Sequence, residues 1–322
     1  MSFPVFDLHC DTALALYDKT NDPHYSLRSS IGHIDLQRAK ELGAYTQCFA
    51  MFTTPSFTDS YQKPVETVFR EMLANFQREL EQCRDLILPA GSSREVEQNR
   101  AQGKMSAILT LEGPAGIGFS PDRLEELYNT GFRISTLGWN ERNPLVGSHV
   151  TGGGLTDLGR AYVRECQRLG ILVDVSHISD EGFWDIMEIT QAPVIASHSN
   201  SRAVCPVSRN LTDDMYRAIC QTGGTVGINL YTGFIDTEYA NLDRVVDHIF
   251  HFLELDPTGK HLSLGGDLDG CEALPEGFAD VRGYNALAQH LQNRGLDDRL
   301  LTDLYWNNAM GVMDHALHIH KG

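Results

Sequence analysis

Short apolar runs recur along the chain, and segments with helical periodicity separate them. Eight of the runs have the length of a buried β-strand. They lie at residues 5–8, 45–51, 107–111, 134–137, 171–175, 194–196, 226–229 and 262–264. The helical patterns fall at residues 65–83, 122–128, 157–169, 180–189, 213–220, 242–253 and 286–292. Strands that alternate with helices in this way pair in parallel, joined by crossover helices. The pattern therefore predicts an α/β fold, namely a (β/α)8 TIM barrel.

The domain organisation follows from the continuity of this pattern. Neither a Pro/Ser-rich linker nor a charge block divides the sequence, and no repeat of about 20–50 residues is visible. We therefore expect residues 1–322 to form a single barrel domain. The segment at 300–317 predicts one more helix, packed on the outside of the barrel.

Composition and charge narrow the class of partner. A chain of 322 residues with 42% hydrophobic residues can bury a full core. Its formal net charge of -17 repels polyanions, so we expect neither nucleic acid nor a membrane as a partner, while a homodimer is left open. The chain begins without a basic, apolar leader and ends without an apolar tail, which predicts an unprocessed cytoplasmic protein. The seven cysteines include no CxxC pair and suit reduced thiols.

His9 and Asp11 lie on either side of Cys10, where the first predicted strand ends. Residues two apart on a strand share a face, so this imidazole and this carboxylate can bind one divalent ion at the mouth of a barrel. Cys10 points to the opposite face and is expected to pack outside the lumen. Because an HxD tripeptide is common, the alternative is a strand end with ordinary polar residues.

Four further residues of ligand type follow later predicted strands. They are Glu112 after AILTL, His177 after ILVDVS, His198 after VIAS and Asp267 after LSLGG. The C-terminal ends of all strands meet at one rim of a parallel barrel, so these side chains should converge with the HxD pair. A single histidine at a strand end is more often packed or hydrogen-bonded than ligating, but coincidence at five strand ends favours a metal site. Imidazole and carboxylate groups in this number suffice for two zinc ions, which can activate water and polarise the carbonyl of an amide.

Several segments of the sequence resemble those of one known family. They are FDLHCDT, LTLEGP, LVDVSHISDEGFWDI, PVIASHSNSRAVCPVSRNLTDD and LGGDLDG, which together span residues 6–270. Their order and spacing are similar to those of the membrane (renal) dipeptidase family, peptidase family M19 of the amidohydrolase superfamily. The resemblance implies a barrel hydrolase with two zinc ions per chain and a dipeptide as its small-molecule substrate.

The resemblance also implies which residue binds which ion. His9 and Asp11 would bind one zinc ion, and His177 and His198 would bind the other. Glu112 would bridge the two ions and so take part in catalysis as well as in metal binding.

Two further residues match functional positions of the family. Asp267 falls where the family has its catalytic acid/base. Arg209 falls where the family has an arginine that receives the terminal carboxylate of the substrate, a role that suits the planar fork of a guanidinium. By its residue type alone, Arg209 could equally cap a helix or pair with Asp213 or Asp214.

Trp139 marks a departure from the family. Several members carry a histidine in the loop after the fourth strand, in a TLTH-like string, and this histidine helps to hold the tetrahedral intermediate. This chain instead reads STLGWNERN, which places Trp139 there. An indole N–H can donate a hydrogen bond but cannot titrate, so we expect Trp139 to contact the substrate and to alter which substrates fit.

The expected activity is hydrolysis of the amide bond of a small dipeptide, including dipeptides with a D-residue at the C-terminal position. One alternative is a related zinc amidohydrolase that acts on N-acyl amino acids, lactones or a dipeptide within a secondary-metabolite precursor. A second alternative is a barrel that keeps its metal but has lost turnover. Shared fold and shared ligands do not distinguish these alternatives.

Overall fold

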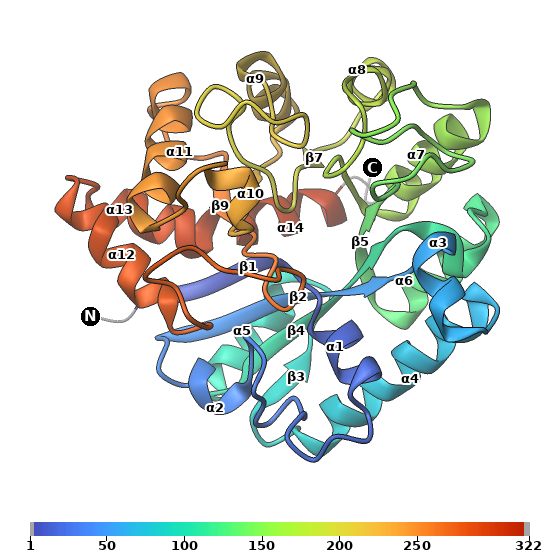
Figure 1. The fold of residues 1–322 in the computed structure, drawn as a ribbon, viewed down its shortest axis with the longest axis horizontal. Helices are drawn as coiled ribbons and strands as arrows, with labels where there is room; N and C mark the ends of the chain where they lie inside the picture. The colour runs from blue at the N-terminus through green and yellow to red at the C-terminus, as the bar shows by residue number, and fades with distance from the viewer. Residues whose placement is uncertain (1–2, 319–322) are drawn as a thin grey trace.

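The computed structural model describes residues 3–318 and has the (β/α)8 barrel that the alternating pattern predicts (Figure 1). The barrel strands are β1 (Pro4–Cys10), β2 (Ala44–Phe52), β4 (Met105–Glu112), β5 (Phe132–Thr136), β6 (Leu172–Asp174), β7 (Val194–Ile195), β8 (Val226–Ile228) and β9 (Leu262–Leu264). They pair in parallel in the order β7-β6-β5-β4-β2-β1-β9-β8. A bridge between Ala196 and Val226 brings β7 beside β8, so the ring is nearly closed.

One further strand lies outside this ring. Strand β3 (Ile87–Pro89) pairs in parallel with the first residues of β4 and is not part of the barrel itself. It has three residues and ends in a proline, so its sequence carries no recognisable strand pattern.

Helices connect the strands and cover the barrel from outside (Figure 1). They are α1 (Thr12–Asp18), α2 (Leu36–Ala39), α3 (Pro55–Thr58), α4 (Val65–Gln82), α5 (Ser93–Ala101), α6 (Leu124–Thr130), α7 (Asp157–Leu169), α8 (Asp180–Ile189), α9 (Asp213–Thr222), α10 (Thr232–Ile235), α11 (Leu242–Leu255), α12 (Gly283–Asn293), α13 (Asp298–Thr302) and α14 (Asn308–His318). Helices α7, α8 and α9 begin where Thr156, Ser179 and Thr212 accept a hydrogen bond from the backbone N–H three residues later. These caps explain why the predicted starts of the three helices are correct.

Two apolar layers hold the barrel together. The inner layer fills the lumen and contains Phe6, Leu8, Cys48, Ile108, Ile134, Leu172 and Ile195. The outer layer lies between strands and helices and includes the alternate strand residues, such as Val5 and Val173. Cys10 belongs to the outer layer, as its place between His9 and Asp11 predicts.

The C-terminal segment differs from its prediction. Residues 300–317 were expected to form one helix on the outside, but a π-helical turn, Asp303–Asn307 (η4), separates α13 from α14. Trp306, Ala309, Val312 and Met313 join the inner apolar layer, and Asn308 donates to the carbonyl of Leu262 at the start of β9. The segment therefore closes the N-terminal end of the barrel. The apolar periodicity of this segment predicts a helix, but it does not predict which surface of the barrel the helix covers.

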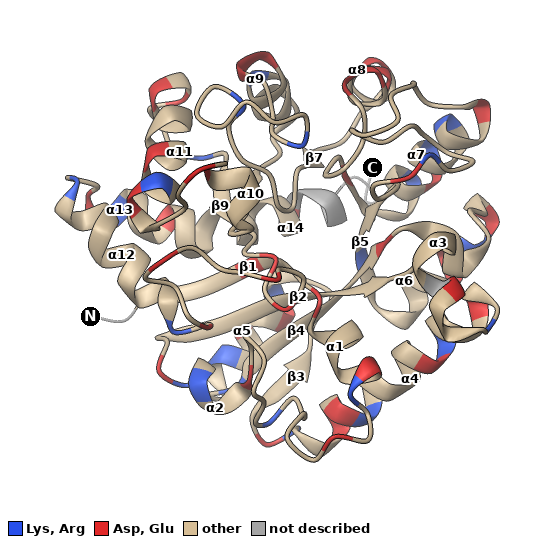
Figure 2. Ribbon diagram, in the orientation of Figure 1, with Lys and Arg blue, Asp and Glu red and all other residues tan. Residues whose placement is uncertain are grey.

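The outer helices carry residues of both charges. Figure 2 shows acidic and basic residues interspersed on helices such as α4, α7 and α11. Within residues 3–318, the structure contains no helix with the length and apolar character needed to cross a membrane.

Trp306 provides a test of how the barrel is closed. Its side chain is 4% exposed, and its ring packs edge-on against Phe6 at 5.9 Å. We expect Trp306→Ala to lower the free energy of unfolding by about 3–5 kcal/mol, because it leaves a cavity at the end of the lumen. The control is Trp184→Ala, whose side chain is 46% exposed on α8 and whose loss should cost under about 0.5 kcal/mol. Urea denaturation of both variants measures the difference, and equal midpoints would contradict this account.

Candidate metal centre

The five predicted ligands meet at the C-terminal end of the barrel. Glu112 is the last residue of β4, and His9 lies near the end of β1. His177 and His198 each follow a strand by three residues, after β6 and β7. The side chains of all five residues, including Asp11, are buried. The structure thus brings together residues that are remote in the sequence.

A β-bulge in β1 aims the first two ligands. Asp7 pairs with Gln47, whereas Cys10 pairs with Phe49, so one strand has an extra residue between these two pairs. The extra residue reverses the alternation of side chains after the inward-facing part of β1. His9 and Asp11 consequently both face the mouth of the barrel, and Cys10 faces outward.

Glu112 lies between the histidines. Its Oε2 atom is 3.3 Å from Nε2 of His9, and its Oε1 atom is 3.1 Å from Nε2 of His177 and 3.9 Å from Nε2 of His198. Asp11 completes the first group, with Oδ2 3.5 Å from Nε2 of His9. The two oxygens of one carboxylate therefore face two different groups of ligands.

Hydrogen bonds fix the tautomer of His177. Its Nδ1 atom lies 2.9 Å from the side-chain oxygen of Asn140, which can only accept, so Nδ1 carries the proton. The Nε2 atom of His177 therefore presents a lone pair to the centre. Asn140 also accepts from Nε2 of His149, whose Nδ1 lies 3.0 Å from the hydroxyl of Ser208.

His198 is oriented in the same way by a different chain of residues. The hydroxyl of Ser197 donates to Asp174 at 2.5 Å and so accepts from Nδ1 of His198 at 2.7 Å. The Nε2 lone pairs of His177 and His198 then face each other at 2.9 Å. Two facing lone pairs repel unless a positive charge lies near both, which is what a bound cation supplies.

The electrostatics of the centre also fit a divalent ion. Burial lowers the pKa of His177 and of His198 well below its usual value, with a further contribution from Arg209, so both rings are neutral and able to ligate. Burial also acts to lower the pKa of His9, but Glu112 and Asp11 outweigh it and raise that pKa. Nε2 of His9 and Oδ1 of Asp11 are buried and have no hydrogen-bond partner in the described part of the chain. These residues therefore fit a metal ion that prefers imidazole and carboxylate ligands.

Asp267 lies beside these ligands. Its Oδ1 atom is 3.8 Å from Nε2 of His9, and its Oδ2 atom accepts a hydrogen bond from Asn229 at 3.1 Å. Burial raises the pKa of Asp267 to about 7, against the opposing effect of His9 and with the help of Asp11 and Glu112. Asp267 and His177 both have a left-handed backbone, with φ of 56° and 71°, a conformation that is unfavourable for these residue types and concentrates at functional sites.

Arg209 is 4% exposed and lies behind His198. It donates to the hydroxyl of Ser199 at 2.7 Å and to the carbonyl of His198 at 2.9 Å. Its Nε atom has no hydrogen-bond partner, and no carboxylate within residues 3–318 forms an ion pair with it. Burial lowers the pKa of Arg209 to about 10, so it stays charged at neutral pH.

The expected alternative partners of Arg209 are engaged elsewhere. Asp213 contacts His251 at 2.8 Å, and Asp214 contacts Arg217 at 3.0 Å. Pairing of Arg209 with either aspartate is therefore wrong as an explanation of its place in the sequence.

A cavity of about 290 Å³ opens onto the candidate ligands. Phe52, Phe57 and Trp139 form an aromatic wall on it, and Glu112, His177 and Asp267 are among its polar lining. The Trp139 ring packs edge-on against Phe52 at 5.1 Å and lies 6.4 Å from the ring of His177. Trp139 therefore lines the cavity that opens onto the candidate ligands.

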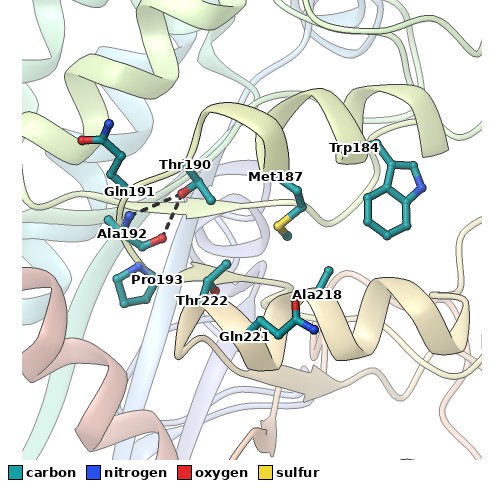
Figure 3. A pocket seen from close by; sticks show the side chains of 9 residues that line it. All are labelled: Trp184, Met187, Thr190, Gln191, Ala192, Pro193, Ala218, Gln221 and Thr222. Atoms are coloured by element: carbon teal, nitrogen blue, oxygen red, sulfur yellow. Dashed lines mark hydrogen bonds between the residues drawn. The ribbon is translucent and has the colours of Figure 1, made fainter.

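A wider hollow of about 450 Å³ lies between α8 and α9 (Figure 3). Its lining includes Trp184, Met187 and Gln221 but no acid, base or metal-binding residue. It offers no group for the chemistry that the barrel mouth can support.

Three residues of this site were missed by the sequence reasoning: Asn140, Asp174 and Asn229. Asp174 was detectable, because a carboxylate within the apolar run LVDVS must be buried and satisfied by donors. Asn229 ends the predicted strand at 226–229, as the ligands end theirs. Asn140 lies in a loop, and its contact with His177 depends on a loop path that no local pattern shows.

Comparison with known proteins identifies the family. A model of the membrane dipeptidase family (peptidase family M19) matches residues 1–321. An uncharacterised dipeptidase of Schizosaccharomyces pombe is 29% identical, over 98% of this chain and 83% of that protein.

Solved structures agree with this match. A metallopeptidase from Rhodobacter sphaeroides, liganded with a phosphinate mimic of the dipeptide L-Ala-D-Ala, has a TM-score of 0.90 at 29% identity and covers 98% of this chain and 100% of its own. The dipeptidase AC, a metallopeptidase of family M19, has a TM-score of 0.89 at 30% identity, with 98% and 99% covered. With a family match over nearly its whole length and ligands gathered at the barrel mouth, the chain belongs to the membrane dipeptidase family, peptidase family M19.

Proposed function

We propose that the protein is a binuclear zinc dipeptidase that hydrolyses the amide bond of small dipeptides, including those with a C-terminal D-residue. The position of Glu112 carries the proposal, because its two oxygens face His9 on one side and His177 on the other. His9 with Asp11 would hold one ion, and His177 with His198 the other. Each set forms a cluster of ligand-type atoms that includes Glu112. Imidazole and carboxylate donors suit zinc.

The residues around the centre support a proton-transfer role for Asp267. Zinc at these ligands would polarise the scissile carbonyl and lower the pKa of a water molecule. Asp267, with a pKa of about 7, would accept the proton of the attacking water and pass it to the leaving amine. Asn229 holds Oδ2 of Asp267, so Oδ1 faces the ligands.

Arg209 and the aromatic wall would position the substrate. The buried guanidinium of Arg209 is charged and free of carboxylates, which supports a role in binding the terminal carboxylate of a dipeptide. Trp139 and Phe52 would contact the rest of the substrate and keep water from it. The L,D-dipeptide mimic bound by the Rhodobacter sphaeroides peptidase supports a C-terminal D-residue here. Seven cysteines without disulfides support an enzyme of the reducing cytoplasm.

The metal dependence is tested by Glu112→Gln. We expect it to reduce the content of both ions, and to lower kcat/KM more than about 100-fold, because even the loss of an outer partner of a metal ligand costs 10–100-fold. His177→Ala should mainly empty one site. Metal analysis after dialysis, with zinc restoring activity to chelated wild type, gives the readout. Glu272→Gln, which changes a cavity carboxylate outside the ligand set, should keep both ions. Full activity in protein shown to be metal-free would refute the proposal.

The role of Arg209 is tested by Arg209→Met. Loss of a charged hydrogen-bonding partner should raise KM about 10–100-fold and leave the metal content unchanged. The effect should shrink for a dipeptide whose terminal carboxylate is amidated. Arg217→Met, on the surface of α9, serves as the control. Equal losses for free and amidated substrates would show that Arg209 supports His198 or the fold instead.

Trp139→Ala tests the aromatic wall. Loss of apolar contact shared by the ground and transition states should raise KM about 10-fold and widen the range of accepted side chains. Steady-state kinetics on a panel of dipeptides and N-acyl amino acids measures both effects, and also tests the alternative substrates. A fall in kcat of about 100-fold at constant KM would instead identify the indole N–H as a donor to the transition state. No dipeptide turnover by wild type, with activity gained in Trp139→His, would favour the inactive barrel.

A further inference from the structure

A second group of metal-binding residue types lies at the opposite end of the barrel. Cys220 is in the last turn of α9, Asp256 directly follows α11, and His261 immediately precedes β9. One ligand-type atom of each residue lies within 4.8 Å of those of the other two. Because His261 comes before its strand, the group is at the N-terminal end of the barrel, away from Glu112 and His177.

A buried carboxylate oxygen at this group is unsatisfied. The Oδ2 atom of Asp256 has no hydrogen-bond partner among residues 3–318, although Oδ1 accepts from Thr258. The Tyr216 side chain is fully buried beside Asp256, and its hydroxyl contacts Cys220. Buried polar atoms without partners are unfavourable and call for a ligand or ordered water.

The other two side chains are prepared for ligation. Nδ1 of His261 lies 2.7 Å from the carbonyl of Gly224, so Nδ1 donates and the lone pair of the ring is on Nε2. Cys220 is less buried than the other six cysteines, which leaves it accessible. Burial, with the charge of Asp256, raises the pKa of the Cys220 thiol to about 12. A divalent cation would displace this proton to solvent and bind the thiolate.

We propose that Cys220, Asp256 and His261 form a structural divalent-metal site, suited to zinc and separate from the catalytic centre. A thiolate, an imidazole and a carboxylate are zinc ligands, and water or the hydroxyl of Tyr216 completes four-coordination. The ion joins the ends of α9 and α11 to the start of β9. This end of a (β/α)8 barrel serves stability, so the ion acts on the fold.

Cobalt(II) titration of metal-depleted full-length protein tests the site. The candidate catalytic ligands offer nitrogen and oxygen only, so a thiolate-to-cobalt charge-transfer band reports the second site. We expect this band in the wild type. In Cys220→Ala the band should be absent, and the protein should bind one metal equivalent fewer than the wild type. Asp256→Asn and His261→Gln should each weaken cobalt binding at least about 10-fold. Glu254→Gln, which changes an exposed carboxylate at the same end of α11, should retain the band.

Two further measurements separate this site from the proposed activity. Zinc should slow alkylation of Cys220 at least about 10-fold, with the other cysteines as internal references in mass spectrometry. Dipeptide hydrolysis should be unchanged in Asp256→Asn. Absence of the band in wild type, its persistence in Cys220→Ala, or unaltered cobalt affinity in both Asp256→Asn and His261→Gln would overturn the proposal. None of these outcomes depends on whether the enzyme hydrolyses dipeptides.

Discussion

Buried negative charge at the mouth of the barrel is the constraint on which the site depends. Asp11, Glu112 and Asp267 lie within reach of one imidazole, that of His9, and their side chains are at most 14% exposed. Removing carboxylates from water is costly unless a cation is near them. A proton on His9 relieves part of that cost, and divalent ions would relieve more while also occupying the facing lone pairs of His177 and His198. The arrangement is stable to the extent that it binds cations.

Hydrogen bonds from several polar side chains hold this arrangement in place. Asp174 accepts from Thr136, Ser176 and Ser197, and so links strand ends β5, β6 and β7 around His198. Asn140, in the loop after β5, accepts hydrogen bonds from His149 of the same loop and from His177 of the loop after β6. Such outer contacts set which ring nitrogen faces the ions, and this is as important to the chemistry as the presence of a histidine.

The fold and the position of the site could be predicted from the sequence because both depend on the spacing of apolar residues and on the order of strands and helices along the chain. All eight barrel runs became strands, and parallel pairing puts their C-terminal ends on one rim whatever the loops do. The rest depends on contacts between distant segments. The bulge before Cys10, the short strand β3, the seat of Trp306 in the lumen and the contact of Asn140 with His177 leave no periodic signal. The roles assigned to Arg209 and Trp139 remain predictions.

The order of the elements along the chain also determines when the barrel can close. His9 belongs to the first strand of the barrel, whereas the loop with Asp267 follows the last one, and η4 and α14, which close the other end of the lumen, come later still in the sequence. The barrel that positions the candidate ligands therefore closes late, since β1 must pair with β9 across most of the chain. A chain truncated before β9 would leave β1 and β8 without the strand that lies between them, so each would have an open edge. Open strand edges favour aggregation, so the barrel gains its protection only once β9 is in place.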